Sequence, residues 1–173
     1  DERVVHQEDI RKPDTSRMVL IPAGNFEMGS PLGESNTEKS TQHTVWVDAY
    51  YLDRFEVTNA EFEKFVNETG YVTDAERRGK GTVWNPGEPD ISDNILGVSW
   101  RKPHAWGENR PYPPEWNTSQ APDQPVLHVS WNDARAYCEW AGKRLPTEAQ
   151  WEKAAMGPTW RRWPWGNEWM DGN

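Results

Sequence analysis

The stretch PVLHVSWNDARAYCEWAGKRLPTEAQWEKAAMG, residues 125–157, decides the fold expected of this chain. It predicts two short amphipathic helices joined by a turn that contains LPTE. The first helix is expected to begin at Ser130 and the second at Thr147, with Gln150 at the position that closes a capping box. Glycine is a good helix stop because it adopts a left-handed conformation at little cost. The expected stops are Gly142 and Gly157.

Each of these helices has one face of small and apolar side chains at helical spacing, which is expected to be buried. The faces consist of Ala134, Tyr137, Cys138 and Ala141 on the first helix and of Trp151, Ala154 and Ala155 on the second. Asn132 and Asp133 stand at the start of the first helix, where such side chains satisfy free backbone N–H groups. We therefore predict that they cap the helix and do not form a metal site.

The same signals predict a third helix and strands nearer the N-terminus. Thr58 and Glu61 match a capping box, apolar side chains follow at helical spacing, and Gly70 is the expected stop. Residues 43–58 begin with the alternation of a half-buried strand. Residues 18–30 contain an apolar run, a turn and a short strand pattern.

About fifty residues between the helices at 58–70 and 130–142 show little periodicity and much Pro, Gly, Trp and Asn. An unstructured loop of that length is unusual inside a compact domain. A solvated linker is not expected to carry four tryptophans, so we predict irregular structure packed onto the domain. The four are Trp84, Trp100, Trp106 and Trp116.

The composition is low in aliphatic residues and acidic. Leu, Ile, Val and Phe make up 26 of the 173 residues, and the net charge is -9, a combination typical of disordered chains. The 12 tryptophans argue against disorder, because each can bury a large apolar area. We predict a loop-rich globular domain with an aromatic core. The acidic balance argues against a nucleic-acid or anionic-membrane partner, and no apolar run approaches the ~18 residues that span a bilayer.

The opening residues 1–17 are polar and without periodicity, which predicts a flexible leader of the kind that follows a cleavage site. Such a leader favours export to the periplasm or the exterior, while a cytoplasmic location stays open. The single cysteine, Cys138, cannot form a disulfide within the chain and gives no indication of the compartment.

Several segments, read in order, resemble one family. They are MVLIPAGNFEMGS (18–30), VDAYYLDRFEVTNAEFEKFVNETGYVTDAE (47–76), the stretch at 125–157, and WPWGNEW (163–169). They resemble the sulfatase-modifying-factor domain, named for the formylglycine-generating enzyme. The resemblance implies a loop-rich α+β fold similar to the C-type lectin type, with little regular secondary structure. It also implies a domain over residues 18–173 that is incomplete at its C-terminus.

The resemblance implies a chemistry for the complete domain. In the enzymes of this family a cysteine pair late in the domain binds copper and uses oxygen to oxidise a sulfatase cysteine to formylglycine, and calcium sites also lie in the later half. Copper(I) needs soft thiolate ligands, whereas this chain has one cysteine. Cys138 matches a structural position that is disulfide-bonded in some relatives. We therefore expect no catalytic residue, no metal ligand and no cofactor within this chain.

Two functions follow for the whole protein. One is a copper-dependent oxidase, of which this chain alone is inactive. The other is a non-catalytic binding or scaffold subunit of an exported complex, because lectin-like folds support many functions. A closely spaced cysteine pair in sequence beyond Asn173 would distinguish them.

By the same resemblance, the stretch TDAERRGKGTVW (73–84) lines the groove that holds the substrate peptide. Ala75 matches the family there. Lys80 and Gly81 stand where an acidic residue and a serine occur in an enzyme of the family. This departure argues against simple transfer of the sulfatase specificity.

The remaining polar candidates are expected to be structural. Alternation in VLHVSW turns His128 inward as a core histidine. Arg144 and Glu148 flank the LPTE turn and are expected to form a polar pair. Arg161 and Arg162 lie among tryptophans, where they are expected to stack on indoles or to form a binding surface.

The tryptophan-rich surface around Trp131, Trp151 and Trp165 is expected to be covered by material outside this sequence. A soluble monomer rarely exposes a large apolar patch. The expected partners are the remainder of the domain or a protein that covers its C-terminal face, together with a protein substrate.

Overall fold

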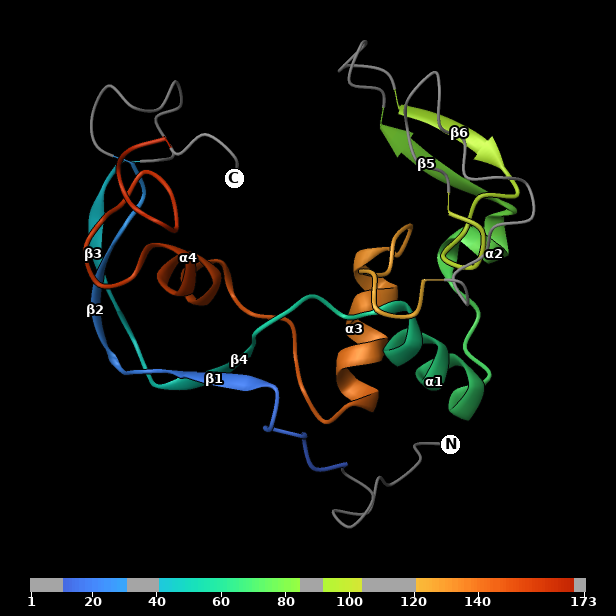
Figure 1. Cartoon of the computed structure of the whole chain (residues 1–173), viewed down its shortest axis with the longest axis horizontal. Helices are drawn as coiled ribbons and strands as arrows, with labels where there is room; N and C mark the ends of the chain where they lie inside the picture. The colour runs from blue at the N-terminus through green and yellow to red at the C-terminus, as the bar shows by residue number, and fades with distance from the viewer. Residues whose placement is uncertain (1–10, 31–40, 85–91, 104–120, 170–173) are drawn as a thin grey trace, which may run out of the picture. The chain divides into compact units, whose positions relative to one another are not determined.

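The computed structural model describes most of the chain (Figure 1). The described residues are 11–30, 41–84, 92–103 and 121–169. Short helices and two-stranded sheets alternate with long connections, which confirms the predicted α+β class with little regular secondary structure. The chain divides into two compact units. We call Asp1–Pro13 with Phe55–Leu145 the helical unit, and Asp14–Arg54 with Pro146–Asn173 the ribbon unit.

In the described part of the helical unit there are three helices and one hairpin. The helices are α1 (Asn59–Thr69), α2 (Asp74–Arg78) and α3 (Trp131–Trp140). The hairpin pairs β5 (Lys80–Trp84) antiparallel with β6 (Ser92–Leu96). α1 and α3 lie side by side, and α2 leads directly into β5 (Figure 1). The hairpin and α2 lie within the fifty-residue stretch for which the sequence predicted irregular structure, so that prediction is wrong for these segments.

All three helices begin with a capping box, in which a hydroxyl and an acidic side chain satisfy backbone N–H groups. The box of α1 was predicted, whereas for α3 the sequence predicted only that Asn132 and Asp133 cap the helix start. Gly70 ends α1 in the left-handed conformation, with φ +67°, as expected of a helix stop.

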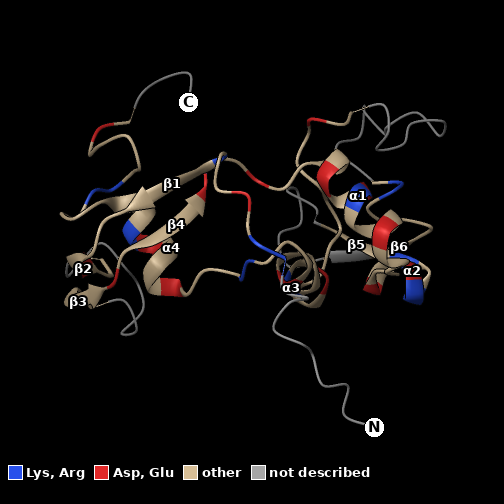
Figure 2. Cartoon of the chain, turned by 90° about the horizontal axis from the view of Figure 1, so that it is seen from below, with Lys and Arg blue, Asp and Glu red and all other residues tan. Residues whose placement is uncertain are grey.

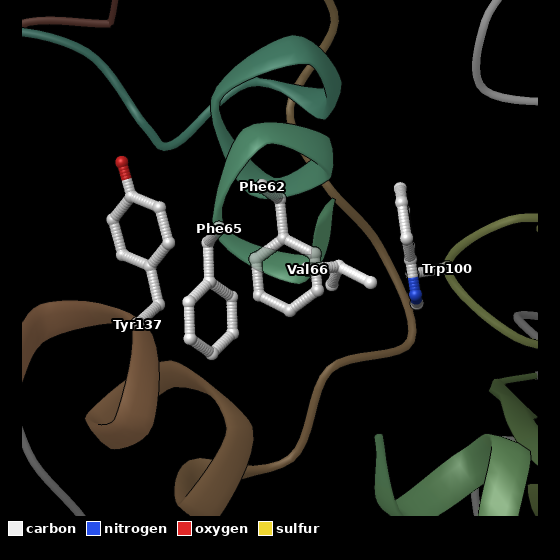
Figure 3. Close-up of a cluster of buried hydrophobic side chains, with 5 residues drawn as sticks. All are labelled: Phe62, Phe65, Val66, Trp100 and Tyr137. Carbon is white, nitrogen blue, oxygen red and sulfur yellow. The ribbon is translucent and has the colours of Figure 1, made fainter. Parts of the chain in front are cut away.

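Aromatic side chains form the core of the helical unit (Figure 3). Phe62 and Phe65 point from α1 toward Tyr137 of α3, and Trp100 packs edge-on against Phe62 at 5.2 Å between ring centroids. Trp100 is 0% exposed. The predicted aromatic core is confirmed, as is the packing of Trp100. Trp106 and Trp116 lie outside the described residues, as does the Trp84 side chain.

The described residues of the ribbon unit form two antiparallel strand pairs and one helix. β1 (Met18–Ile21) pairs with β4 (Tyr50–Asp53), and β2 (Gly24–Met28) pairs with β3 (His43–Val47). α4 (Glu148–Met156) packs on β2 and β3 (Figure 1). Thr147 and Gln150 form the predicted capping box of α4, and Gly157 follows its last residue.

The inner side of α4 is polar, which corrects the sequence prediction. Gln150 and Lys153 are its buried residues, whereas Trp151, predicted to be buried, is 63% exposed. The Lys153 ammonium donates to the carbonyl oxygens of Pro22 and Gly24, at 2.8 and 2.9 Å. Because the strand turn presents these carbonyls to α4, a donor is needed on that face, and the adjacent indole is turned away.

Further bonds join α4 to the strands. Lys153 also donates to the carbonyl of Val47 at 3.3 Å, and the Glu152 carboxylate accepts from the backbone N–H of Gly29. The Tyr50 hydroxyl donates to the carbonyl of Gln150. Polar contacts between side chains and backbone therefore fix α4 on the strands.

The predicted leader is described only from residue 11. Arg11 contacts α1 and α3: its guanidinium lies 4.1 Å from the Trp140 ring centroid and 3.2 Å from the Glu68 carboxylate. Only glycine fits at position 142, because a Cβ there would lie 1.9 Å from the carbonyl oxygen of Arg11. Among the described residues, no helix has the length and apolar character needed to cross a membrane.

Candidate functional site

The segment that the resemblance places in the substrate groove forms α2 and β5. Ala75 is buried on α2, and Gly81 is buried on β5 against Val98. A Cβ at Gly81 would lie 2.6 Å from a Val98 methyl carbon, so only glycine fits without movement. Lys80, which directly precedes Gly81 in the sequence, is half-buried. Ala75 and Gly81 therefore pack the segment, and their assignment to a substrate groove stays a prediction.

A polar network joins the first turns of α2 and α3. The Asp133 carboxylate accepts from the Tyr71 hydroxyl and from the backbone N–H of Asp74, each at 3.0 Å. The Asp74 carboxylate accepts in turn from the Ser130 hydroxyl at 2.5 Å and lies 3.4 Å from the Asn132 amide nitrogen. The two helix starts thus exchange side-chain hydrogen bonds in both directions.

Two acidic side chains at α2, Asp74 and Glu76, are each paired with an arginine. Arg77 donates to Asp74 at 2.8 Å, and Arg101 donates to Glu76 at 3.1 Å while stacking on Trp100 at 4.4 Å. Both carboxylates also serve helix N-termini, where the backbone dipole favours negative charge. In Figure 2 acidic and basic residues lie next to one another at α2.

The pKa values follow these contacts. The hydrogen bond from Arg77, with smaller contributions from Ser130 and Asn132, lowers the pKa of Asp74 to about 2. Burial opposes ionisation of Glu76, but hydrogen bonds from Thr73 and the Arg101 charge lower its pKa overall. Burial also raises the pKa of Tyr71. At neutral pH Asp74 and Glu76 are therefore ionised, and the phenol of Tyr71 is neutral.

The capping prediction for Asp133 is confirmed, since it closes the capping box of α3 with Ser130. The prediction of an inward core position for His128 is wrong. Its φ is +56°, it is half-buried, and its Nδ1 lies 3.2 Å from the Thr82 carbonyl oxygen. The left-handed residue interrupts the alternation, so Val126 and Val129 pack against the core.

Cys138 is half-buried on α3 and packs against the aromatic core of the helical unit. Trp131 is exposed at the start of the same helix, with the Arg135 guanidinium 5.7 Å from its ring centroid. Arg144 is exposed in the helical unit and Glu148 is exposed in the ribbon unit. Their pairing stays a prediction.

The tryptophans near Arg161 and Arg162 pack on one another. Trp163 and Trp165 are stacked at 5.7 Å between ring centroids, and Trp169 meets Trp163 edge-on at 5.1 Å. Arg161 donates to the Met156 carbonyl at the end of α4, at 2.6 Å. The Arg161 side chain thus satisfies a carbonyl at the end of α4, where Gly157 is the C-cap.

Sequence reasoning missed α2 and its network. A local signal was present, because Thr73 and Glu76 have capping-box spacing and Gly79 follows as a stop. No comparable signal showed that Asp133 would contact Tyr71 and Asp74, which lie 62 and 59 positions away. Among the described residues, no group of three or more His, Cys, Asp or Glu side chains could hold a metal ion.

The chain belongs to the family of sulfatase-modifying factor enzyme 1-like domains, whose model matches residues 3–173. It is 45% identical over 167 residues to a formylglycine-generating enzyme of Bos taurus, covering 91% of this chain and 44% of that protein. A formylglycine-generating enzyme of Streptomyces coelicolor is 42% identical over 169 residues, covering 91% of this chain and 53% of that protein.

Two further comparisons bear on activity and fold. The inactive C-alpha-formylglycine-generating enzyme 2 of Bos taurus is 37% identical over 166 residues, covering 89% of this chain and 54% of that protein. The structure of PvdO from Pseudomonas aeruginosa matches with a TM-score of 0.60 and 24% identity, over 90% of this chain and 52% of that chain. The latter likeness supports the fold alone. The chain spans about half the length of the curated relatives it matches.

Proposed function

We propose that this chain supplies the peptide-receiving part of a formylglycine-generating domain, and that oxidation of the substrate cysteine needs residues outside this chain. The observation that carries the proposal is the 45% identity to a formylglycine-generating enzyme along 91% of the chain. The departures at Lys80 and Gly81 leave the identity of the substrate peptide open.

The donor set of this chain does not fit the copper site that the family implies. Copper(I) in proteins is held by soft ligands such as paired thiolates. The chain contains one cysteine, and Cys138 packs against the aromatic core. A thiol in that position is better suited to packing than to redox chemistry, because reactive cysteines are accessible and lie in electropositive surroundings. Copper and calcium stay predictions about the complete family domain.

The test compares this chain with the full-length protein made from its natural gene. Each is incubated with copper, oxygen and a cysteine-containing sulfatase-motif peptide, and the aldehyde is measured by mass spectrometry after hydrazide capture. We expect formylglycine from the full-length protein alone. Aldehyde from the 173-residue chain above the protein-free blank would contradict the division of roles.

A second candidate is a non-catalytic binding or scaffold subunit of an exported complex. The observation that favours it is the 37% identity to a relative named as inactive. In the same experiment this function predicts that the full-length protein binds a peptide or protein partner but forms no aldehyde. Detection of the native protein in the periplasmic or secreted fraction, and not in the cytoplasm, tests the export that this second function includes.

We also propose that the exposed indoles are covered in the working protein by the remainder of the domain or by a partner protein. Within the ribbon unit Trp151 is 63% exposed and Trp165 is 41% exposed, and in the helical unit Trp131 is 64% exposed. Expression of residues 1–173 alone tests the idea through hydrophobic-dye binding and sedimentation. A monomer that unfolds cooperatively and binds no dye would show that no cover is needed.

A further inference from the structure

The four capping boxes of the described helices differ in the residue that closes them. Glutamates Glu61 and Glu76 close those of α1 and α2, an amide at Gln150 closes that of α4, and Asp133 closes that of α3. Gln150 accepts from the backbone N–H of Thr147 at 3.0 Å through its one carbonyl oxygen. A helix of this protein can therefore be capped without a carboxylate, and capping alone does not explain the acid at position 133.

Asp133 uses its two oxygens for different tasks. Oδ2 accepts from the backbone N–H of Ser130 at 2.8 Å, which is the capping contact. Oδ1 accepts from the Tyr71 hydroxyl and the Asp74 N–H, which are not part of α3. The side chain is 0% exposed. A buried carboxylate is costly unless its lone pairs are satisfied, so this arrangement makes α2 part of the environment that Asp133 needs.

The position of α2 in turn determines the start of the hairpin. α2 has five residues, which is too short for a helix to be stable without tertiary contacts. Gly79 ends it in the left-handed conformation, and its carbonyl accepts from the N–H of Gly97 at 2.9 Å. Gly81 then packs against Val98. A shift at the first turn of α2 would thus be transmitted to β5.

We propose that Asp133 is a positioning residue, whose Oδ1 fixes α2 and the following strand at the start of α3 and so places the segment Thr73–Trp84. The part of this inference that treats the segment as a peptide groove rests on the function proposed above. The placement itself rests on the described contacts alone.

The experiment uses the full-length natural protein with Asp133→Asn and a matched control, Glu61→Gln. Asparagine has one acceptor oxygen, so it cannot keep both the Ser130 contact and the Tyr71 and Asp74 contacts. In α1, Glu61 accepts from the N–H and the hydroxyl of Thr58 through the same atom, Oε2, so glutamine can keep both bonds. The control therefore makes the same chemical change, from carboxylate to amide, in a capping box whose two bonds to Thr58 share one oxygen.

Hydrogen exchange measured by mass spectrometry is the primary readout. We expect Asp133→Asn to speed exchange of peptides covering residues 71–84 by about tenfold, and Glu61→Gln to leave them within twofold. Tyr71→Phe removes one donor without altering the α3 cap, so it should produce a smaller increase over the same residues, even if Asp133→Asn folds poorly. Faster exchange confined to α3, or no change in 71–84 with either variant, overturns the proposal.

Affinity for the sulfatase-motif peptide, measured well below the unfolding temperature of each variant, distinguishes the positioning role of Asp133 from the proposed peptide-groove function. We expect Tyr71→Phe and Asp133→Asn to weaken binding and Glu61→Gln to leave it unchanged. If residues 71–84 are loosened while affinity stays constant, Asp133 positions the segment and the peptide-groove function is wrong. If all three variants weaken binding equally with equal exchange, general destabilisation explains the result and the positioning role is wrong.

Discussion

The helical unit and the ribbon unit are stabilised in different ways. In the helical unit, rings from α1, α3 and the segment at Trp100 exclude water from one another. In the ribbon unit Phe26 is the one buried apolar side chain among the described residues, and the buried contacts of α4 are made by Lys153 and Gln150. The ribbon unit also exposes several indoles. The difference shows that aromatic rings form a buried core where α1 and α3 meet, and that a high tryptophan content does not by itself ensure burial.

The largest expected effect is on the aromatic core. Replacing Trp100 with Ala removes a fully buried indole and should reduce the free energy of unfolding by about 3–5 kcal/mol. The control is Trp169→Ala, which removes a 57% exposed indole of the ribbon unit and its ring contacts, and should lower the free energy of unfolding by only about 1 kcal/mol. Denaturant unfolding measures both. If the two variants lost equal free energy of unfolding, the two units would not differ in how they depend on their aromatic side chains.

The next effect is on the ribbon unit. Lys153→Met keeps the side-chain length but removes the buried ammonium that donates to the carbonyl groups of Pro22, Gly24 and Val47, so we expect a loss of about 3 kcal/mol in the free energy of unfolding. Lys64→Met, at a side chain 61% exposed on α1, should cost less than about 0.5 kcal/mol. A loss at Lys153 as small as that of the control would mean that the ribbon unit does not depend on these bonds.

A smaller effect is expected at the edge of the aromatic core. Cys138→Ser places a hydroxyl where a thiol packs, and should reduce the free energy of unfolding by about 1–3 kcal/mol. The native thiol should also react slowly with a thiol reagent and quickly in denaturant. Equal reaction rates in the two states would show that Cys138 is accessible and that the structural assignment is wrong.

The smallest effect concerns pH. Because the folded-state pKa of Asp74 is lowered from 3.8 to about 2, its contribution to stability is complete above pH 3.8 and is lost as the pH falls toward 2. Asp74→Asn should therefore show a shallower loss of stability over that range than the unchanged protein, measured by thermal unfolding. The two slopes would be the same if the contacts with Arg77 and Ser130 do not favour the ionised form.

Local signals in the sequence determined the helix starts and the family. Thr58 with Glu61, Ser130 with Asp133 and Thr147 with Gln150 are each three positions apart, so each cap can be recognised without knowing the fold. The aromatic core was also predicted from composition. The chain is acidic and poor in aliphatic residues, so aromatic side chains are the main apolar groups that it can bury. The site was predicted less well, since Ala75, Lys80 and Gly81 were assigned by resemblance and α2 was missed.

Only the tertiary structure decided which faces and atoms meet. Lys153 meets the carbonyl of Pro22 from 131 positions away, and Asp133 meets Asp74 from 59 positions away. Neither contact can be predicted from hydrophobic periodicity, because the sequence does not distinguish a solvated polar residue from one that is buried against a partner. The exposure of Trp151 has the same origin. The face of α4 that is buried depends on the carbonyl groups opposite it, and those belong to strands whose position the sequence of the helix cannot specify.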